Sequence, residues 1–259
     1  MNNPNYPDFI KYPSILHLAE DLSILDNDVK LFEKLDGGNS QVRYYNGRIL
    51  AGNRSKFLSE INKRFGWFQS FLKWAKSNYS FFNLPEEVIV YGEWLNSHTL
   101  EYSKESKNHF YLIDLFDIAS KKFLDYSNAV EKIKIWGIED VRVLDCLFNG
   151  KISEKKLEDL VINRESDYRK GHMEGVVVKD YSSQSFSKLW RKSLVQKEIT
   201  FEDLKKQIFT LGEEGKKISR KSILGSIIDD LERQNIPYDR QNVKEIVEGF
   251  LKNKDLDKI

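Results

Sequence analysis

Residues 33–39 (EKLDGGN) place a lysine, Lys34, two residues before an aspartate and a pair of glycines. A lysine is protonated at neutral pH, and it becomes a nucleophile where burial or a neighbouring cation lowers its pKa. The glycines allow close backbone approach or a positive φ, so a phosphate chain could lie beside the amine. Taken alone, the segment equally describes a surface lysine beside an Asp-Gly-Gly turn.

Five other short segments place charged or aromatic residues in or beside apolar runs. They are Arg54-Ser55-Lys56, YGEW at 91–94, FYLIDLFD at 110–117, EGVVVK at 174–179 and KLWRK at 188–192. In type, order and spacing, these segments and EKLDGGN resemble the motifs of the covalent nucleotidyltransferase superfamily, which includes nucleic-acid ligases and mRNA-capping enzymes. The resemblance covers about residues 30–195, and the tandem of K-x-D-G and EGVVVK is its most specific part.

The resemblance implies a catalytic role for three lysines. Lys34 would attack the α-phosphate of ATP, release pyrophosphate and carry AMP as a phosphoramidate. Lys179 and Lys188 would hold the α-phosphate and offset the charge that builds up in the transition state. Glu174 is the implied metal-binding or lysine-facing carboxylate, and the implied cofactors are ATP and Mg²⁺ (or Mn²⁺).

The same resemblance adds residues to the nucleotide site. Glu93 would bond the ribose hydroxyls, Arg54 would contact the phosphates or the incoming strand, and Glu33 would border the nucleotide. The last motif departs from the family pattern of two lysines one residue apart. Here Lys188 is followed by Leu189 and Trp190, and further positive charge comes only at Arg191 and Lys192.

A purine base needs a flat apolar partner, and the strand at 110–118 offers three aromatic residues. Strand alternation would place Phe110 and Phe116 on one face and Tyr111 on the other. We favour Phe110 over Phe116 as the residue that stacks on adenine.

Two features favour RNA as the substrate. Asn39 stands where the DNA ligases and many capping enzymes have an arginine, whereas RNA ligases of the second phage type have an asparagine, whose carbonyl can orient metal-bound water. Residues 200–259 are too few, and too helical in pattern, for the OB domain of the DNA ligases. The expected protein is an ATP-dependent RNA ligase. A DNA ligase, a capping-type enzyme and a non-catalytic nucleic-acid-binding relative remain alternatives.

These motifs must be positioned by strands and tight turns. The predicted fold is α+β, with an ATP-grasp-like nucleotidyltransferase domain of antiparallel sheets flanked by helices at 1–199 and a small helical domain at 200–259. Residues 41–52 predict a hairpin across Asn46-Gly47. Apolar patterning predicts strands at 88–94, 110–118, 175–179 and 188–192, and helices at 15–25, 61–80, 138–146, 153–161, 201–211, 222–234 and 242–253.

Composition limits the remaining possibilities. With 41 basic and 40 acidic residues, the net charge of +1 argues against a strongly basic nucleic-acid coat, so contact with RNA needs a local cationic cluster. The one cysteine, Cys146, rules out a disulfide framework and is interpreted as a buried thiol. Four histidines lack metal-ligand spacing, although His172 could line the pocket.

No signal peptide or membrane span is recognised in the sequence. We therefore expect an intracellular, cytoplasmic protein that acts on RNA ends, in a nicked duplex or a structured RNA, without a membrane or a protein partner.

Overall fold

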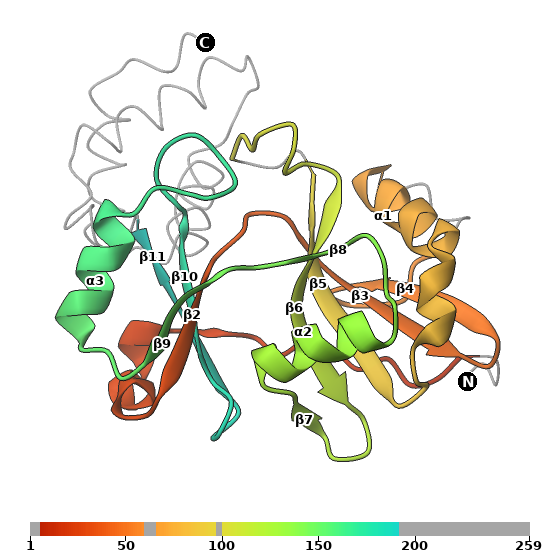
Figure 1. Ribbon diagram of the computed structural model, residues 1–259, viewed down its shortest axis with the longest axis horizontal. Helices are drawn as coiled ribbons and strands as arrows, with labels where there is room; N and C mark the ends of the chain where they lie inside the picture. The colour runs from red at the N-terminus through yellow and green to blue at the C-terminus, as the bar shows by residue number, and fades with distance from the viewer. Residues whose placement is uncertain (1–5, 60–65, 97–99, 192–259) are drawn as a thin grey trace, which may run out of the picture. The chain divides into compact units, whose positions relative to one another are not determined.

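Two β-sheets dominate the computed structural model, which describes residues 6–59, 66–96 and 100–191 (Figure 1). The five-stranded sheet has the order β1-β11-β10-β2-β9, and the six-stranded sheet has the order β4-β3-β5-β6-β7, with β8 paired to β6. The strands are β1 (Leu16–His17), β2 (Val29–Glu33), β3 (Gly38–Tyr45), β4 (Arg48–Asn53), β5 (Val88–Leu95), β6 (His109–Asp117), β7 (Lys122–Phe123), β8 (Val141–Val143), β9 (Cys146–Gly150), β10 (Gly175–Asp180) and β11 (Ser185–Trp190).

Three α-helices accompany the sheets in the described ranges: α1 (Gly66–Ser77), α2 (Tyr126–Ile135) and α3 (Glu154–Asn163). Apolar side chains of α1 and α2 form one core with those of β5 and β6, whereas α3 lies on the side of the five-stranded sheet (Figure 1). Asp125 caps α2 by accepting a hydrogen bond from the amide of Ser127 at 2.9 Å. This mixed architecture of mainly antiparallel sheets agrees with the predicted α+β class.

The predicted hairpin is confirmed by β3 and β4. Asn46 and Gly47 have φ of 44° and 72°, the two positive values that a two-residue type I′ turn requires. The strands then pair from Tyr45↔Arg48 to Ser40↔Asn53. This hairpin carries Asn39 at one end of β3 and leads at the end of β4 to Arg54.

A β-bulge interrupts the pairing of β5 with β6. Tyr91 lies opposite Asp114 and Gly92 lies opposite Leu112, so Ile113 is an extra residue on β6. A bulge shifts the side-chain alternation on either side of it. The prediction that Phe110 and Phe116 share a face is therefore wrong: Phe110 packs in the core on α1, whereas Phe116 belongs to the separate cluster that contains Tyr91.

Two predicted helices are also wrong. Residues 15–25 form β1 and two short 3-10 helices, Leu18–Glu20 and Leu22–Asp26. The segment at 138–146 forms β8 and the start of β9, since its alternating valines suit a strand. Cys146 is exposed, which corrects the expected buried thiol.

Helix α2 was not among the predicted elements. Within its span Ala129 and Ile133 bury one face, and Gly137 follows the helix with a φ of 63°. The helix predicted at 153–161 corresponds to α3, which is capped by Ser153.

The chain divides into two units, Met1–Leu189 and Trp190–Ile259. The three helices predicted after residue 200, and with them the helical C-terminal domain, lie outside the described residues. Within the described ranges, no helix is both long enough and apolar enough to cross a bilayer.

Candidate active site

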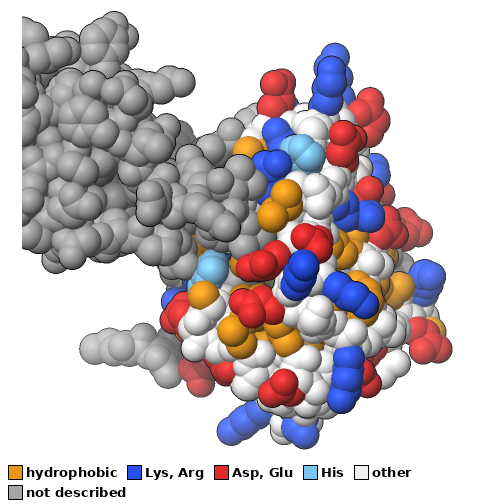
Figure 2. All heavy atoms as spheres, turned by 90° about the vertical axis from the view of Figure 1, so that its left-hand side faces the viewer, with side chains coloured by type: hydrophobic (Ala, Val, Ile, Leu, Met, Phe, Trp, Pro, Cys, Tyr) orange, Lys and Arg blue, Asp and Glu red, His pale blue; other side chains and the backbone are white. Residues whose placement is uncertain are grey.

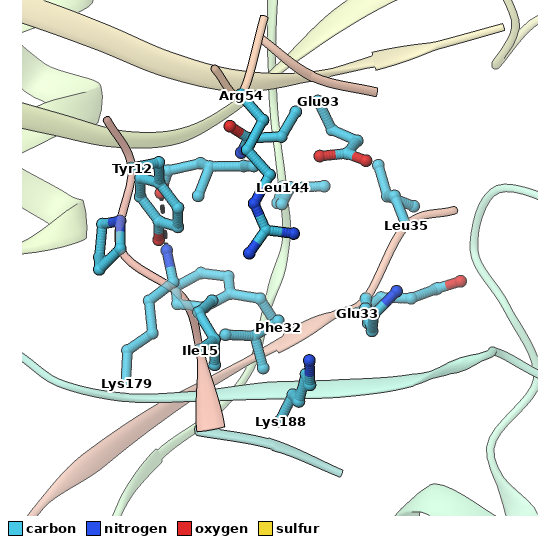
Figure 3. Close-up of a pocket in the computed structure, with 15 residues that line it drawn as sticks. Tyr12, Ile15, Phe32, Glu33, Leu35, Arg54, Glu93, Leu144, Lys179 and Lys188 are labelled. Atoms are coloured by element: carbon cyan, nitrogen blue, oxygen red, sulfur yellow. Dashed lines mark hydrogen bonds between the residues drawn. The ribbon is translucent and has the colours of Figure 1, made fainter. Parts of the chain in front are cut away.

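A pocket lies among residues of both sheets and of the segment that precedes β1 (Figure 3). Side-chain alternation places Phe32, Lys34, Val177 and Lys179 on the pocket side of β2 and β10. The pocket is lined by Tyr12, Pro13, Ile15, Phe32, Glu33, Lys34, Leu35, Asn39, Arg54, Glu93, Ile113, Leu144, Val177, Lys179 and Lys188. Most of the predicted site residues therefore line one pocket. Glu174 is not among the lining residues, but it binds Lys34, which is.

Lys34 follows β2 directly, and its amine is held by Glu174. The Nζ atom donates to both carboxylate oxygens of Glu174 at 2.8 Å, and the Lys34 amide donates to the Gly175 carbonyl at 2.9 Å. The two side chains are 22% and 24% exposed. The pair is thus open enough for a substrate to reach the amine.

Gly37 is needed for a close approach of the backbone to β5 and not for a positive φ. A Cβ on Gly37 would lie 2.7 Å from the Trp94 carbonyl oxygen and 2.9 Å from Glu93 Cγ. The Gly37 amide also donates to Glu93 Oε1 at 3.1 Å. Asp36 is tied to a neighbouring loop, since its carboxylate accepts from the Leu100 amide. These contacts hold the segment that follows Lys34 against β5 and against the loop at Leu100, at the mouth of the pocket.

Glu93 is a half-buried carboxyl on β5, opposite Asn39 on β3. Burial raises the pKa of Glu93 to about 8, although Lys34 and the Gly37 amide oppose the shift. A carboxyl with such a pKa changes its ionisation within the working range of an enzyme, which is typical of functional sites.

Two further cations point into the pocket from opposite sides (Figure 3). Arg54 comes from the segment after β4 and Lys188 from β11. Burial, followed by the charges of Lys34 and Arg54, lowers the pKa of Lys188. Three cations that face one space repel each other and attract an anion such as a phosphate.

Lys179 occupies a different environment at the inner end of the pocket. Its Nζ donates to Asp114 Oδ2 and to the Ile113 carbonyl, both at 2.8 Å, the latter bond shown dashed in Figure 3. The rings of Phe32 and Phe186 lie 5.2 Å and 5.5 Å from the ammonium. With 3% of its side chain exposed, Lys179 joins β10 to β6 and borders the pocket at its inner end, and its contact with the α-phosphate stays a prediction.

The segment before β1 closes one side of the pocket. Tyr12, itself buried, donates to Asp114 Oδ2 at 2.5 Å, and Tyr181 donates to Oδ1 at 2.7 Å. The Ile10 carbonyl accepts from Gln41 Nε2 and the Tyr91 hydroxyl in the six-stranded sheet, while His17 in β1 pairs with Lys188 in the five-stranded sheet. The segment at 10–17 therefore bridges the two sheets.

Phe110 is not available to stack on a base. Its side chain is fully buried, and its ring stacks on Phe71 and Trp74 at centroid distances of 5.6 Å and 5.2 Å. The bulge instead turns Ile113 into the pocket, where Val177 also contributes an apolar wall. No signal in the sequence marked this bulge.

Glu33 borders the pocket, but its carboxylate serves the opposite face of β2. It accepts from the Ser166 hydroxyl at 2.5 Å and from the Asp167 amide at 3.1 Å. The Glu33 carboxylate thus anchors residues 166 and 167, and burial raises its pKa. Its predicted nucleotide-binding role stays a prediction.

Within the described ranges, no group of three or more His, Cys, Asp or Glu side chains is placed to hold a metal ion. His172 is exposed and does not line the pocket. A magnesium site needs only one or two carboxylates when substrate phosphates and water complete the shell. Glu174 beside Lys34, and Asn39 in the pocket wall, fit such a partial donor set.

This fold, with a lysine at the mouth of a cation-lined pocket, defines a nucleotidyltransferase domain of the ligase type. The chain belongs to the RNA ligase family, whose sequence pattern it matches over residues 27–194. No curated protein matches the sequence.

Solved structures of a Naegleria gruberi RNA ligase share the fold. An apo form is 18% identical with a TM-score of 0.57, and the match covers 74% of this chain and 59% of that one. A form with ATP and Mn is 17% identical with a TM-score of 0.57 and the same coverage. A form with AMP and Mn is 17% identical with a TM-score of 0.56, covering 76% and 60%. This chain thus spans less than two thirds of the Naegleria protein.

Proposed function

We propose that the chain is an ATP-dependent RNA ligase that joins an RNA 3′-hydroxyl to a 5′-phosphate through lysyl-AMP and RNA-adenylate intermediates. The observation that carries the proposal is the placement of Lys34 Nζ, 2.8 Å from both Glu174 oxygens and on the rim of a pocket that Arg54 and Lys188 also enter. A binding module needs cations, but it has no need for an amine held by a carboxylate.

In the first step, the Lys34 amine attacks the α-phosphorus of ATP. A bond between Nζ and phosphorus forms, the bond to the bridging oxygen breaks, and pyrophosphate leaves. The ammonium must give up a proton beforehand, and Glu174 lies within the 2.6–3.2 Å range that proton transfer requires. Phosphoryl-type transfers depend mainly on alignment and on charge stabilisation, which Lys188 and Arg54 would supply.

The pocket walls suit the other parts of AMP. Ile113 and Val177 would hold the two faces of the purine, so an aliphatic side chain takes the place of the predicted aromatic one. Glu93 would accept hydrogen bonds from the ribose hydroxyls, as predicted from the sequence. Lys179 would support this slot indirectly, through its bond to the carbonyl of Ile113.

A divalent cation, Mg²⁺ or Mn²⁺, would be held by Glu174 and, through water, by Asn39. Such an ion supplies charge neutralisation on the phosphate oxygens. Forms of the Naegleria enzyme with Mn and a nucleotide support the choice of ATP and a divalent metal.

The remaining steps would reuse the pocket. A 5′-phosphate oxygen of RNA attacks the phosphorus of lysyl-AMP, and the Lys34 amine leaves. The 3′-hydroxyl then attacks the RNA 5′-phosphorus of the adenylated end, and AMP leaves. We propose a nicked duplex or a structured RNA as the substrate.

Intact-mass spectrometry after incubation with ATP and MgCl₂ tests the first step. We expect one added AMP on the wild-type chain, located at Lys34 by peptide mapping, and none on Lys34→Ala. A Lys34→Ala protein that still carries AMP would refute the assignment of the nucleophile.

Sealing of nicked duplexes tests the substrate. The panel compares 3′-hydroxyl ends of RNA and DNA opposite the same template, with ATP and with GTP. We expect sealing of the RNA end with ATP alone. Equal rates on RNA and DNA ends would contradict the RNA assignment, and labelling by GTP would point to a capping-type enzyme.

A further inference from the structure

A short hairpin at residues 164–172 lies between α3 and β10, outside the set of residues that line the pocket. Its arms meet at the Glu165↔His172 bridge, and the Ser166 amide donates to the Gly171 carbonyl at 2.8 Å. Gly171 has a φ of 92°, which favours glycine in the turn. We call this segment the 164–172 hairpin.

Three contacts fix the hairpin beside the pocket. The buried carboxylate of Glu33, the residue before the nucleophile, binds Ser166 and Asp167. The Tyr168 ring packs edge-on against Tyr111 of β6 at 5.2 Å. The Tyr168 carbonyl accepts from the Ser103 amide at 3.1 Å. The hairpin is therefore tied to both sheets rather than attached only at its ends.

The returning arm of the hairpin carries positive charge without a carboxylate. Arg169, Lys170 and His172 lie within residues 169–172, and Lys170 and His172 are exposed. The outgoing arm has Glu165 and Asp167, but Asp167 is paired with Arg164 at 2.9 Å. The tip is thus a local cationic element on a chain whose net charge is only +1.

The arginines of the hairpin retain hydrogen-bonding capacity. Arg169 Nη1 donates to the His172 carbonyl, which holds the side chain along the turn. Within the described ranges, the Nε atoms of Arg164 and Arg169 are shielded from solvent, so a phosphate oxygen can reach only the terminal Nη groups. A guanidinium whose side chain is held in place is suited to bind a phosphate oxygen through those groups.

The hairpin leads directly to the reacting amine. Glu174 follows His172 by two residues and binds Lys34 Nζ. Four residues of extended chain span at most about 14 Å, so Lys170 lies within that distance of Glu174. With roughly 3.4 Å of helix axis per nucleotide, this reach corresponds to the first few nucleotides of a strand that ends at Lys34.

Charges elsewhere on the same side of the molecule are mixed. Figure 2 shows Lys and Arg interspersed with Asp and Glu on the side that carries α3, without a broad region of one sign. Recognition of a polyanion on this side therefore depends on a few positioned cations, such as those of the hairpin, and not on a general positive field.

We propose that the tip of the 164–172 hairpin, through Arg169, Lys170 and His172, binds the backbone phosphates of the RNA strand whose 5′ end receives AMP. The proposal rests on the proposed RNA ligase function. It makes Glu33 a positioning residue that couples this RNA-binding element to the strand of the nucleophile. Phosphate contacts of this kind fix the register of the strand without reading its bases.

The test separates the step that needs no RNA from the step that does. The Arg169→Ala/Lys170→Ala double variant is compared with Lys155→Ala/Lys156→Ala, which removes the same charge from exposed positions on α3. Self-adenylylation with ATP is measured first. Transfer of AMP to a 5′-phosphorylated RNA is then measured with the purified adenylylated proteins in single turnover, from 50 to 200 mM salt.

For the hairpin variant, we expect self-adenylylation within twofold of the wild type and RNA affinity reduced about tenfold. The slope of log affinity against log salt should fall by about 0.7 for each phosphate that the variant no longer binds. The α3 control should retain wild-type affinity and slope. His172→Gln should give a smaller loss of affinity than the double variant.

Three results would overturn the proposal. They are an unchanged RNA affinity in the hairpin variant, an equal decrease in the α3 control, and a slower self-adenylylation with unchanged RNA affinity, which would assign the tip to the triphosphate of ATP. Failure of the ligase assignment itself would be distinct, because the wild-type chain would then accept no AMP at all.

Discussion

Two lysine–carboxylate pairs of equal length lie at opposite ends of the pocket. Lys34 meets Glu174 and Lys179 meets Asp114, each with a shortest N–O distance of 2.8 Å. The first pair is 22% and 24% exposed, and the second is 3% and 0% exposed. The Lys34–Glu174 pair is therefore accessible to a substrate, whereas the Lys179–Asp114 pair is closed to solvent.

The surroundings decide what each pair can do. Asp114 also accepts from two tyrosine hydroxyls, and aromatic rings surround the Lys179 ammonium, so release of that lysine would leave a buried charge. Lys34 has solvent beside it and cations across the pocket. We infer that the outer pair, Lys34–Glu174, is rearranged during the reaction. The inner pair, Lys179–Asp114, holds β10 of the five-stranded sheet against β6 of the six-stranded sheet.

The largest expected effect comes from breaking the inner pair. Lys179→Met leaves Asp114 without its cation in the core and should cost about 3–5 kcal/mol of unfolding free energy. Urea denaturation followed by circular dichroism measures the decrease. The matched control is Lys30→Met, which removes a 2.7 Å pair with the more exposed Asp125 and should cost at most about 1 kcal/mol.

A similar decrease in both variants would refute the claim that burial makes the Lys179–Asp114 pair more costly to break than the Lys30–Asp125 pair. A direct phosphate contact by Lys179 would instead appear as loss of adenylylation at wild-type stability. That outcome would restore the role that the motif EGVVVK predicted for this lysine.

The outer pair is expected to affect rate rather than stability. Glu174→Gln keeps the size of the side chain but removes the charge that holds Lys34 Nζ and would support the metal. We expect self-adenylylation to slow by about 10²-fold, in the range of a missing acid–base group. The denaturation midpoint should stay near that of the wild type.

Rapid-quench measurement with labelled ATP gives the rate for Glu174→Gln. Glu158→Gln on α3 serves as a control for removal of a carboxylate away from the pocket. If Glu174→Gln lowered stability as much as Lys179→Met, the outer pair would be structural as well.

The sequence predicted the outer pair better than the inner one. Lys34, Glu174 and Lys188 lie in short motifs whose order and spacing resemble a known superfamily, and all three converge on one site. Asp114 also lies in such a motif, but nothing local shows that its carboxylate would bind a lysine 65 residues away.

Local patterns failed where long-range pairing decided the outcome. The extra residue Ile113 is defined only by the register of β6 against β5, so alternation within β6 alone wrongly placed Phe110 and Phe116 on one face. Likewise, Glu33 stands beside Lys34 in sequence, yet strand geometry turns its carboxylate to the hairpin on the other face. The Asn46-Gly47 turn was predictable because its constraint is local.

A smaller effect should follow from loosening the inner pair without breaking it. Tyr12→Phe removes one hydroxyl donor from Asp114 and keeps the ring that packs on Tyr91 at 5.0 Å. Removal of a hydrogen bond to a charged group should cost about 2 kcal/mol. If the 10–17 segment sets the spacing of the sheets, the KM for ATP should also rise while kcat changes little.

Tyr181→Phe is the matched variant, because Tyr181 donates to the other oxygen of Asp114 but does not line the main pocket. It should show a similar decrease in stability with an unchanged KM. Equal KM values in the two variants would show that Tyr12 contributes stability alone.

The smallest expected effect concerns Glu93, the carboxyl of β5 that lines the same pocket. Its pKa of about 8 means that the carboxyl is mostly protonated at pH 7 and ionised above pH 9. Since the ionised form is the better acceptor for ribose hydroxyls, ATP affinity should rise about fivefold between pH 7 and pH 9. Isothermal titration of the wild-type chain with α,β-methylene-ATP, whose α–β linkage cannot be cleaved, measures this binding without reaction and keeps the Lys34 charge beside Glu93. Adding Glu93→Gln should leave the ATP affinity independent of pH over that interval. A pH dependence that survived the substitution would belong to another group, such as Lys188. The lowered pKa of Lys188 predicts the opposite trend, a loss of ATP affinity as the pH rises and its positive charge is removed.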